Sequence, residues 1–199
     1  MSHPKLLVTG FGPFETVAEN PSGALARRLD QQLDQQVHGS LRVVGRELPT
    51  AYRGALEALQ ALLEPEGGGF RAILALGVHR GEGFRIERQA GAREVSDRLD
   101  VWGEAFPVAL RHRASTRFDV EACARVCQAL SPLPVWISED AGGYVCDFTY
   151  GQVLRLGEAF GIPALFLHVP PAGILPVAEQ LPVVRGLVEE VWRQVETSL

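Results

Sequence analysis

Short apolar runs alternate with amphipathic stretches along the whole chain. The apolar runs have the length of strands and are bounded by glycine, proline or charged residues, which is typical of strands buried in a sheet. Between them, apolar side chains repeat at the spacing of one helix face, as Leu25, Leu29 and Leu33 do. The predicted strands are 6–9, 41–48, 72–76, 135–137 and 164–167, and the predicted helices begin near residues 20, 50, 119, 145 and 183.

The order of these elements predicts the fold class. Wholly apolar strands are typical of a parallel sheet covered on both faces, and helices between the strands provide that cover. We therefore expect an α/β sandwich with a mostly parallel central sheet. No repeat, low-complexity segment or linker divides the chain, so residues 1–199 are predicted to form a single domain.

Residues 78–118 interrupt the pattern. This stretch carries many charged side chains and few helix signals. We expect hairpins or a long excursion beside the functional face of the sheet, because long loops in compact domains commonly serve function or are mobile.

Charge and hydropathy restrict the partners. The 199 residues carry a net charge of −5 with no basic run, which argues against a nucleic-acid partner. No apolar run approaches the roughly 20 residues that span a bilayer, so no membrane partner is expected. The apolar part of the N-terminus is too short for an export signal, and we therefore expect a cytoplasmic protein.

The chain has three cysteines, and two of them are predicted to pack in the core. Cys123 and Cys127 lie four residues apart on one predicted helix, and no further Cys or His stands at ligand spacing. We therefore expect no metal and no other cofactor. An odd number of cysteines does not make a disulfide framework, and free thiols fit a reducing compartment.

The third cysteine stands at a predicted turn between a strand and a helix. Cys146 follows Gly142 and Gly143, which permit a tight turn, and it falls in or near the first turn of the helix. Unpaired N–H groups and the helix dipole stabilise an anion there, and the thiolate is the nucleophilic form of cysteine. Cys146 is thus a candidate nucleophile; the alternative is a small buried apolar side chain.

Other features with chemical potential also fall where predicted strands end. They are the aromatic pair Phe11 and Phe14, then Gly77 with the residues after it, and His168. Ligands of parallel α/β sheets bind beyond the carboxyl ends of the strands, so these features are expected to lie together with Cys146. The two phenylalanines are either plugs of the core or an apolar clamp for a flat ligand.

A Cys–His pair needs a third group that holds the imidazole in the correct tautomer. Glu87 is one candidate among several acids in the charged stretch. The alternative for Glu87 is a surface ion pair with Arg85 or Arg88.

From end to end, the chain resembles the pyroglutamyl peptidases, which are cysteine exopeptidases. Six pieces carry this resemblance in the same order, and together they are specific although each alone is weak. They are Thr9-Gly10-Phe11-Gly12-Pro13-Phe14, Asn20-Pro21-Ser22, Glu47-Leu48-Pro49, Ile86-Glu87-Arg88, the run from Ser138 to Cys146, and Leu167-His168-Val169-Pro170.

The resemblance implies a three-layer α/β/α sandwich and a triad of Glu87, Cys146 and His168. It also implies that Phe11 and Phe14 enclose the lactam ring of the substrate. Asn20, Tyr144 and Val145 fall in matching pieces, and we expect them to contact the substrate as well. Microbial members of the family are often homotetramers, so a homo-oligomer is expected.

The chain departs from the family pattern after Glu87. The asparagine that follows the family's Glu-Arg is absent, and the arginine that assists the oxyanion corresponds to Arg93 or Arg98 or is lost. The residue after the nucleophile, usually Asn, is Asp147, and a carboxylate there would raise the pKa of the thiol. We expect residues 78–100 to be mobile and to close over the ligand, bringing Arg93 or Arg98 towards the acyl oxygen.

The sequence therefore predicts a cysteine peptidase that removes N-terminal pyroglutamate from peptides through a thioester. Its thiol is expected to react with iodoacetamide well below pH 8. One alternative is a diverged relative that binds a lactam or small amide with little turnover. The other is a nucleoside-phosphorylase-like enzyme, although no glycine loop with a basic residue for phosphate stands at a strand end.

Overall fold

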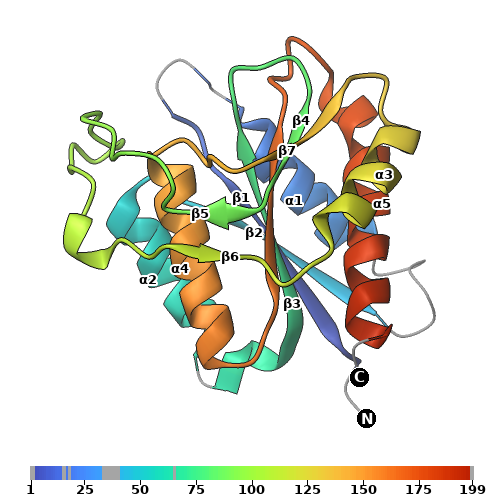
Figure 1. The fold of residues 1–199 in the computed structure, drawn as a ribbon, viewed down its shortest axis with the longest axis horizontal. Coiled ribbons are helices and arrows are strands. Elements are labelled where there is room, and N and C mark those ends of the chain that lie inside the picture. Colours follow the sequence, from blue (N-terminus) through green and yellow to red (C-terminus); the bar gives the residue numbers. More distant parts are fainter. Residues whose placement is uncertain (1–2, 15–16, 18, 33–40, 65, 198–199) are drawn as a thin grey trace.

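A central sheet with helices on both faces forms the body of the protein (Figure 1). The computed structural model describes residues 3–14, 17, 19–32, 41–64 and 66–197. The elements are β1 (Lys5–Phe11), α1 (Pro21–Gln32), β2 (Arg42–Leu48), α2 (Tyr52–Leu63), η1 (Glu66–Gly69), β3 (Phe70–Val78), β4 (Phe84–Glu87), β5 (Gln89–Ala90), η2 (Val108–Leu110), β6 (Ala114–Ser115), α3 (Val120–Leu130), β7 (Val135–Ser138), α4 (Val145–Ala159), β8 (Ala164–Val169) and α5 (Val177–Thr197).

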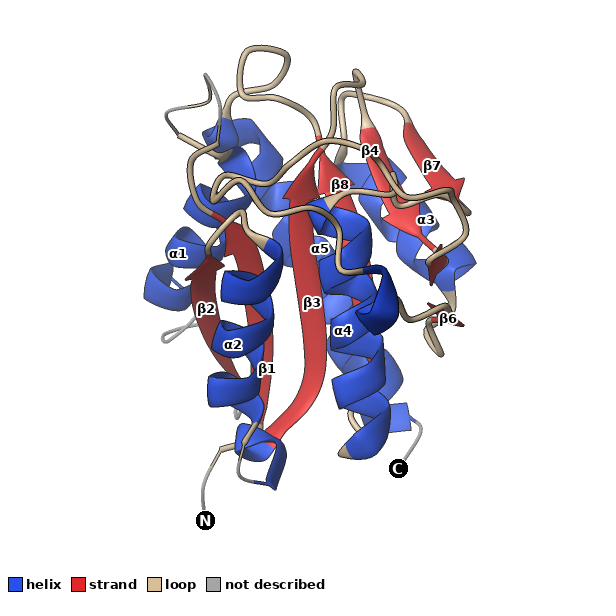
Figure 2. Cartoon of the chain, turned by 90° about the vertical axis from the view of Figure 1, so that its left-hand side faces the viewer, coloured by secondary structure: helices blue, strands red, loops and turns tan. Residues whose placement is uncertain are grey.

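The six-stranded sheet has the order β2-β1-β3-β8-β4-β7. Among the described strands of this sheet, every pairing is parallel except that of β4 with β8. Figure 2 shows β4 and β7 running against the direction of β1, β3 and β8. The predicted sandwich with a mostly parallel sheet is thus confirmed.

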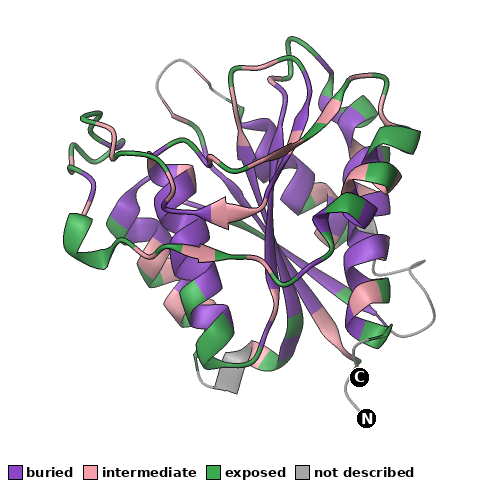
Figure 3. Cartoon of the chain, in the orientation of Figure 1, coloured by how far each residue is buried: buried purple, intermediate pink, exposed green. Residues whose placement is uncertain are grey.

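Successive side chains of each strand point to opposite faces of the sheet, so the core has two halves, one on each face. On β1, Leu6 and Val8 face α1, α3 and α5, whereas Leu7 faces α2 and α4. All three side chains are fully buried, as expected for strands that have a helical layer on each side (Figure 3). The three-layer α/β/α arrangement follows from this division.

Three sequence expectations need correction. The stretch 78–118 is not wholly an excursion, because β4 is a strand of the main sheet. Phe84 and Ile86 of β4 are fully buried on one face. This apolar alternation is short and lies between charged residues, so the sequence did not indicate a strand. The strand predicted at 135–137 lies at the edge of the sheet, with Trp136 46% exposed. Helix α5 begins at Val177 rather than near 183 and contains Pro182. Leu33 lies outside the described residues.

Candidate active site

The turn before α4 places Cys146 at the start of a helix. Gly142 and Gly143 have φ angles of 100° and 65°, a region that favours glycine. A side chain at Gly143 would also overlap the carbonyl group of Glu94. The first helical hydrogen bond runs from the N–H of Phe148 to the carbonyl of Tyr144 (3.0 Å), so the N–H groups before it have no acceptor within the helix.

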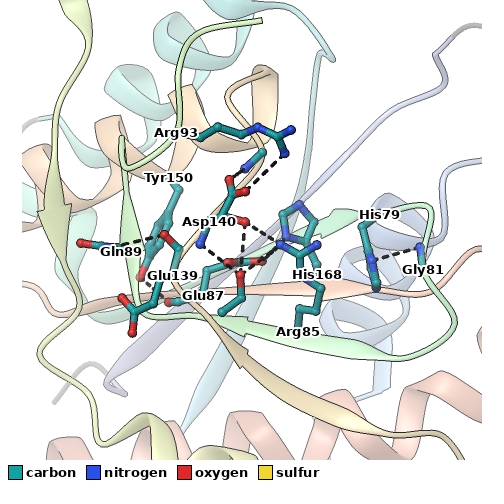
Figure 4. A network of polar contacts seen from close by, with 12 residues as sticks. His79, Gly81, Arg85, Glu87, Gln89, Arg93, Glu139, Asp140, Tyr150 and His168 are labelled. Atoms are coloured by element: carbon teal, nitrogen blue, oxygen red, sulfur yellow. Dashed lines mark hydrogen bonds and ion pairs between the residues drawn. The ribbon is translucent and has the colours of Figure 1, made fainter.

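Glu87 and His168 form a buried pair. Nδ1 of His168 lies 2.6 Å from Oε1 of Glu87, and the two side chains are 5% and 0% exposed (Figure 4). A carboxylate only accepts, so Nδ1 carries the proton and Nε2 of the neutral ring is left as an acceptor. A guanidinium nitrogen of Arg85 lies 3.3 Å from the same carboxylate oxygen.

Glu87 is fully buried, so it does not form the surface ion pair that was the alternative, although Arg85 contacts its carboxylate. The carboxylate is not a surface group, and Arg88 pairs with Glu121 and Glu139 instead. Arg85 also donates to Oγ of Ser138 (3.0 Å) and to the carbonyl of Asp140 (2.5 Å). Arg85 therefore ties the buried carboxylate to the segment that leads to Cys146.

Gly77 makes room for the thiol beside His168. The two residues are partners in the β3–β8 register, and paired positions of a sheet direct their side chains to the same face. Sγ of Cys146 lies 2.8 Å from the position that a Cβ at Gly77 would take. The missing side chain of Gly77 thus leaves space for the sulfur on the face that carries His168.

The surroundings of the thiol disfavour its charged form. Burial above all, with smaller contributions from the carboxylates of Glu87 and Asp147, raises the pKa of Cys146 to about 12. A helix N-terminus stabilises an anion by only about 2 kcal/mol at most, roughly 1.5 pKa units, which the loss of hydration exceeds. Burial thus opposes the stabilisation of a thiolate that was expected from the helix start.

Cys146 opens into a cavity of about 670 Å³, a size common for small-molecule sites. Every predicted substrate residue lines this cavity, and so do both predicted oxyanion arginines. Glu87 and His168 are not part of its lining. The residues that the structure brings together around it are Phe11, Phe14, Asn20, Arg93, Arg98, Tyr144, Val145 and Cys146.

Asn20 holds the aromatic loop in place. Its Nδ2 donates to the carbonyl of Gly12 (3.0 Å), and its Oδ1 accepts from the N–H and the hydroxyl of Ser22 (3.1 and 2.8 Å). Oγ of Ser22 in turn accepts from the N–H of Phe11 (3.0 Å). These bonds join the end of β1 to the start of α1, so the two phenylalanines reach the cavity from a fixed loop.

The stretch after β4 is bonded to the body of the protein. Oδ1 of Asp147 accepts from the N–H of Gly91 (2.8 Å), and the hydroxyl of Tyr144 donates to the carbonyl of Leu99 (2.8 Å). Oδ2 of Asp100 accepts from the N–H of Tyr52 (2.7 Å). The expected mobile lid is thus anchored at several points.

The two candidate arginines already have partners. Arg93 forms an ion pair with Asp140 at 3.3 Å, and the guanidinium of Arg98 lies 4.6 Å from the centre of the Tyr144 ring. Neither contact prevents a guanidinium from reaching the cavity, because both side chains line it.

Sequence reasoning missed His79, whose ring centre lies 5.8 Å from that of His168. His79 follows the long apolar strand β3. The signal that identified His168, a histidine at the end of a predicted strand, applies equally to His79. Sequence reasoning also treated Arg85 only as a surface partner of Glu87. The two lie two residues apart on a strand, a spacing that directs both to one face.

Cys123 and Cys127 are buried, as expected for core residues. Within the described residues, no group of three or more His, Cys, Asp or Glu is placed to hold a metal ion. A search of the same part of the chain finds no helix with the length and apolarity needed to cross a membrane.

Comparison with known proteins identifies the family. The model of a family described as pyroglutamyl peptidase matches residues 4–181. A pyrrolidone-carboxylate peptidase of Gloeobacter violaceus is 31% identical over 172 residues, covering 83% of this chain and 81% of that protein. A protein of the same name from Yersinia pestis is 28% identical over 176 residues, covering 83% and 78%.

Solved structures share the fold. The pyrrolidone carboxyl peptidase of Thermococcus litoralis superposes with a TM-score of 0.85 at 22% identity, over 98% of this chain and 96% of that one. The enzyme of Pyrococcus furiosus gives a TM-score of 0.83 at 23% identity, over 96% and 99%. On the match of the family model and of the curated relatives, this chain belongs to the pyroglutamyl peptidase family.

Proposed function

We propose that this protein is a cysteine peptidase that removes N-terminal pyroglutamate from peptides, with Cys146 as nucleophile, His168 as general base and Glu87 as the group that orients His168. The hydrogen bond of 2.6 Å between Glu87 and His168, beside a thiol lodged over Gly77, carries this proposal. Family membership supplies the substrate class.

The reaction begins with a protonated thiol. Nε2 of His168 takes the proton of Sγ while the sulfur attacks the carbonyl carbon of the pyroglutamyl residue. The C–N bond breaks as the imidazolium of His168 returns the proton to the leaving amine, which leaves a thioester. Water, deprotonated by the same imidazole, then attacks the thioester and releases free pyroglutamate and the thiol.

The oxyanion is stabilised by N–H groups in the first turn of α4, which have no acceptor in the helix. One such donor is typically worth about 3 kcal/mol of transition-state stabilisation. Arg93 or Arg98 supplies an additional donor from the cavity wall.

The substrate residues act through shape and through a few polar groups. Phe11 and Phe14 contact the faces of the lactam ring, which has no charged amine and so suits an apolar clamp. Asn20 fixes the loop that carries the two phenylalanines, while Tyr144 and Val145 close the wall next to the nucleophile.

Hydrolysis of a pyroglutamyl coumarin amide, beside its prolyl analogue, tests the proposal. We expect release of coumarin from the pyroglutamyl compound alone, and loss of turnover in Cys146→Ser with pyroglutamate binding retained. Turnover of Cys146→Ser within tenfold of wild type would reject Cys146 as the nucleophile.

The same assay addresses the alternative of a diverged relative. The high pKa of the Cys146 thiol and the altered stretch after Glu87 are the observations that favour it. Binding of pyroglutamate by the wild type without any turnover would identify such a relative. Family membership leaves no support for the nucleoside-phosphorylase-like alternative.

We further propose that the chain works as one cytoplasmic domain that assembles into a homo-oligomer. The strands of the main sheet come from residues 5 to 169, as in a single domain, and the cysteines of the described residues are free thiols, as in a reducing compartment.

Several large apolar side chains are exposed between residues 99 and 110, which is typical of an association surface. They are Leu99, Val101, Trp102, Val108 and Leu110. Analytical ultracentrifugation of the wild type and of Trp102→Glu tests the assembly.

A further inference from the structure

His79 builds a tight turn between β3 and β4. Its Nδ1 accepts from the N–H of Gly81 (3.1 Å; Figure 4), and its Nε2 donates to the carbonyl of Gly83 (2.7 Å). The single ring thus holds both ends of the turn. A side chain at Gly81 would overlap the ring, at 2.6 Å from Cε1. Burial lowers the pKa of His79, and neighbouring His168 and Arg85 lower it further, so the neutral tautomer that this turn requires is maintained.

Arg80 stands in the middle of this turn. It is exposed and lines the same cavity as Cys146. No ion pair joins Arg80 to another residue in the described part of the chain. Its backbone is thus fixed by His79, while its guanidinium remains available to a ligand.

The charge of the cavity is opposite to that of the protein. The chain carries a net charge of −5, yet among the described residues that line the cavity there are three arginines, Arg80, Arg93 and Arg98, and one acid, Glu19. Glu19 is exposed and lies 4.0 Å from Arg27, which offsets its charge. A concave site lined by one sign of charge concentrates ligands of the other sign.

The cavity is also larger than the lactam ring requires. Two phenylalanines and Asn20 suffice to surround a five-membered ring, and the remaining lining includes His79 and Arg80. The peptide beyond the scissile bond must occupy this remaining space if the ring lies against the phenylalanines.

We propose that Arg80, fixed by the His79 turn, forms an anion subsite that selects pyroglutamyl peptides with an acidic residue after the pyroglutamate. This inference rests on the proposed function and names its substrate class. Arg93 shares its charge with Asp140, so Arg80 is the main determinant and Arg93 and Arg98 add a general positive field. His79 is a positioning residue in this scheme.

Three amide-capped peptides test the subsite, with glutamate, glutamine or lysine after pyroglutamate. Glutamine has nearly the shape of glutamate without its charge, and the cap removes the terminal carboxylate. We expect kcat/KM of the wild type to favour glutamate over glutamine about fivefold at low salt, the size of a partly exposed charge pair, and less at high salt. Arg80→Gln should bring this ratio near one, and Arg80→Glu should favour lysine.

Arg125→Gln is the matched control. It removes the same charge from an exposed residue of α3, on the face of the sheet opposite to α4. The ratio should keep its wild-type value in this variant. A wild-type ratio of one, or an equal loss in Arg125→Gln, would overturn the proposal.

Calorimetric binding of the same peptides to Cys146→Ser separates the subsite from catalysis. Preferential binding of the glutamate peptide, abolished by Arg80→Gln, supports the subsite. If the wild type binds in this way but hydrolyses no peptide, the proposed peptidase activity is wrong and the subsite still stands. Equal binding of all three peptides would overturn the subsite whatever the turnover.

Discussion

Sγ of Cys146 lies 2.8 Å from the place that a Cβ of Gly77 would occupy, although the two residues are on different elements. Gly77 belongs to β3 and Cys146 to the first turn of α4. The helix start can approach the sheet at this point only because β3 has no side chain there. Since Gly77 and His168 are register partners, this close approach also brings the thiol to the strand that carries the base.

Gly77→Ala should therefore reduce both activity and stability. The added methyl group would overlap both Sγ of Cys146 and the ring of Phe166, each at 2.8 Å. We expect kcat to fall at least about tenfold, because a displaced nucleophile loses its alignment. Overpacking of this kind costs about 1–3 kcal/mol of the free energy of unfolding, measured by urea titration.

Gly186→Ala is the control for Gly77→Ala. It adds a methyl group beneath Leu130, whose side chain is half-exposed and free to move, on the other side of the sheet. Activity of Gly186→Ala should match that of the wild type. If Gly77→Ala is equally active, the close approach has no part in positioning the thiol.

His168→Ala should cost more turnover than Glu87→Gln. Loss of the base removes proton transfer in both halves of the reaction, and we expect at least about a thousandfold loss of kcat. The Gln side chain can donate to Nδ1 and so favour the wrong tautomer, which we expect to cost about a hundredfold. Steady-state kinetics of both variants, with Glu189→Gln in the half-exposed surface of α5 as control, measure the difference. A silent Glu87→Gln would remove Glu87 from the site despite its contact with His168.

The sequence predicted the layers and most site residues because both depend on local patterns. Apolar strands bounded by breakers, and Gly-Gly before Cys146, are visible without tertiary information. We expected the site residues to lie together because the carboxyl ends of parallel strands meet at one edge of a sheet. However, β7, the strand before Cys146, runs antiparallel to β8. The chain reaches the site only because residues 139–144 return to the carboxyl end of β3.

Contacts between distant segments were not predictable in the same way. The pairing of β4 with β8 places Arg85 opposite His168 and Glu87 opposite Phe166, and no local signal specifies that register. The hydrogen bonds of the His79 ring join residues that are close in sequence. The several glycines of this segment nevertheless allow many backbone conformations, so the sequence does not predict which one the turn adopts. The protonation of Cys146 depends on burial, which is a property of the whole fold.

Alkylation of Cys146 should follow an alkaline pH profile. Its pKa is raised to about 12, mainly by burial, so the thiolate is scarce at neutral pH and the iodoacetamide rate should still be rising at pH 9. Asp147→Asn removes one of the carboxylates that raise this pKa and should shift the profile to lower pH. Mass spectrometry of the modified peptide gives the rate at Cys146 alone. A plateau of that rate below pH 8 would contradict a protonated resting thiol.

Stability should decline at alkaline pH. Burial raises the pKa of Cys127 to about 12 and raises that of Tyr150 above its ordinary value of 10.0. Below about pH 7 both groups are protonated in the folded and unfolded chains. As pH rises above this, the unfolded chain loses first the cysteine proton and then the tyrosine proton, which the fold retains, so the free energy of unfolding falls. Urea midpoints at pH 8 and 10.5, under reducing conditions, measure this loss. Cys127→Ala should show a shallower decline than the wild type, and an equal decline would exclude Cys127 as a source.

The stretch from 88 to 107 should stay fixed when a ligand binds, contrary to the expectation of a closing lid. Gly91 is held by the carboxylate of Asp147, and Arg111 donates to the carbonyl groups of Gly91 and Arg93. Opening would break these bonds together, and each typically contributes about 1 kcal/mol. We expect hydrogen exchange of this stretch to be slow and nearly equal with and without pyroglutamate. Asp147→Ala should accelerate exchange at Gly91, whereas Asp147→Asn, whose amide oxygen still accepts, should do so far less. Strong ligand-dependent protection across residues 88–107 in the wild type would restore the closing lid.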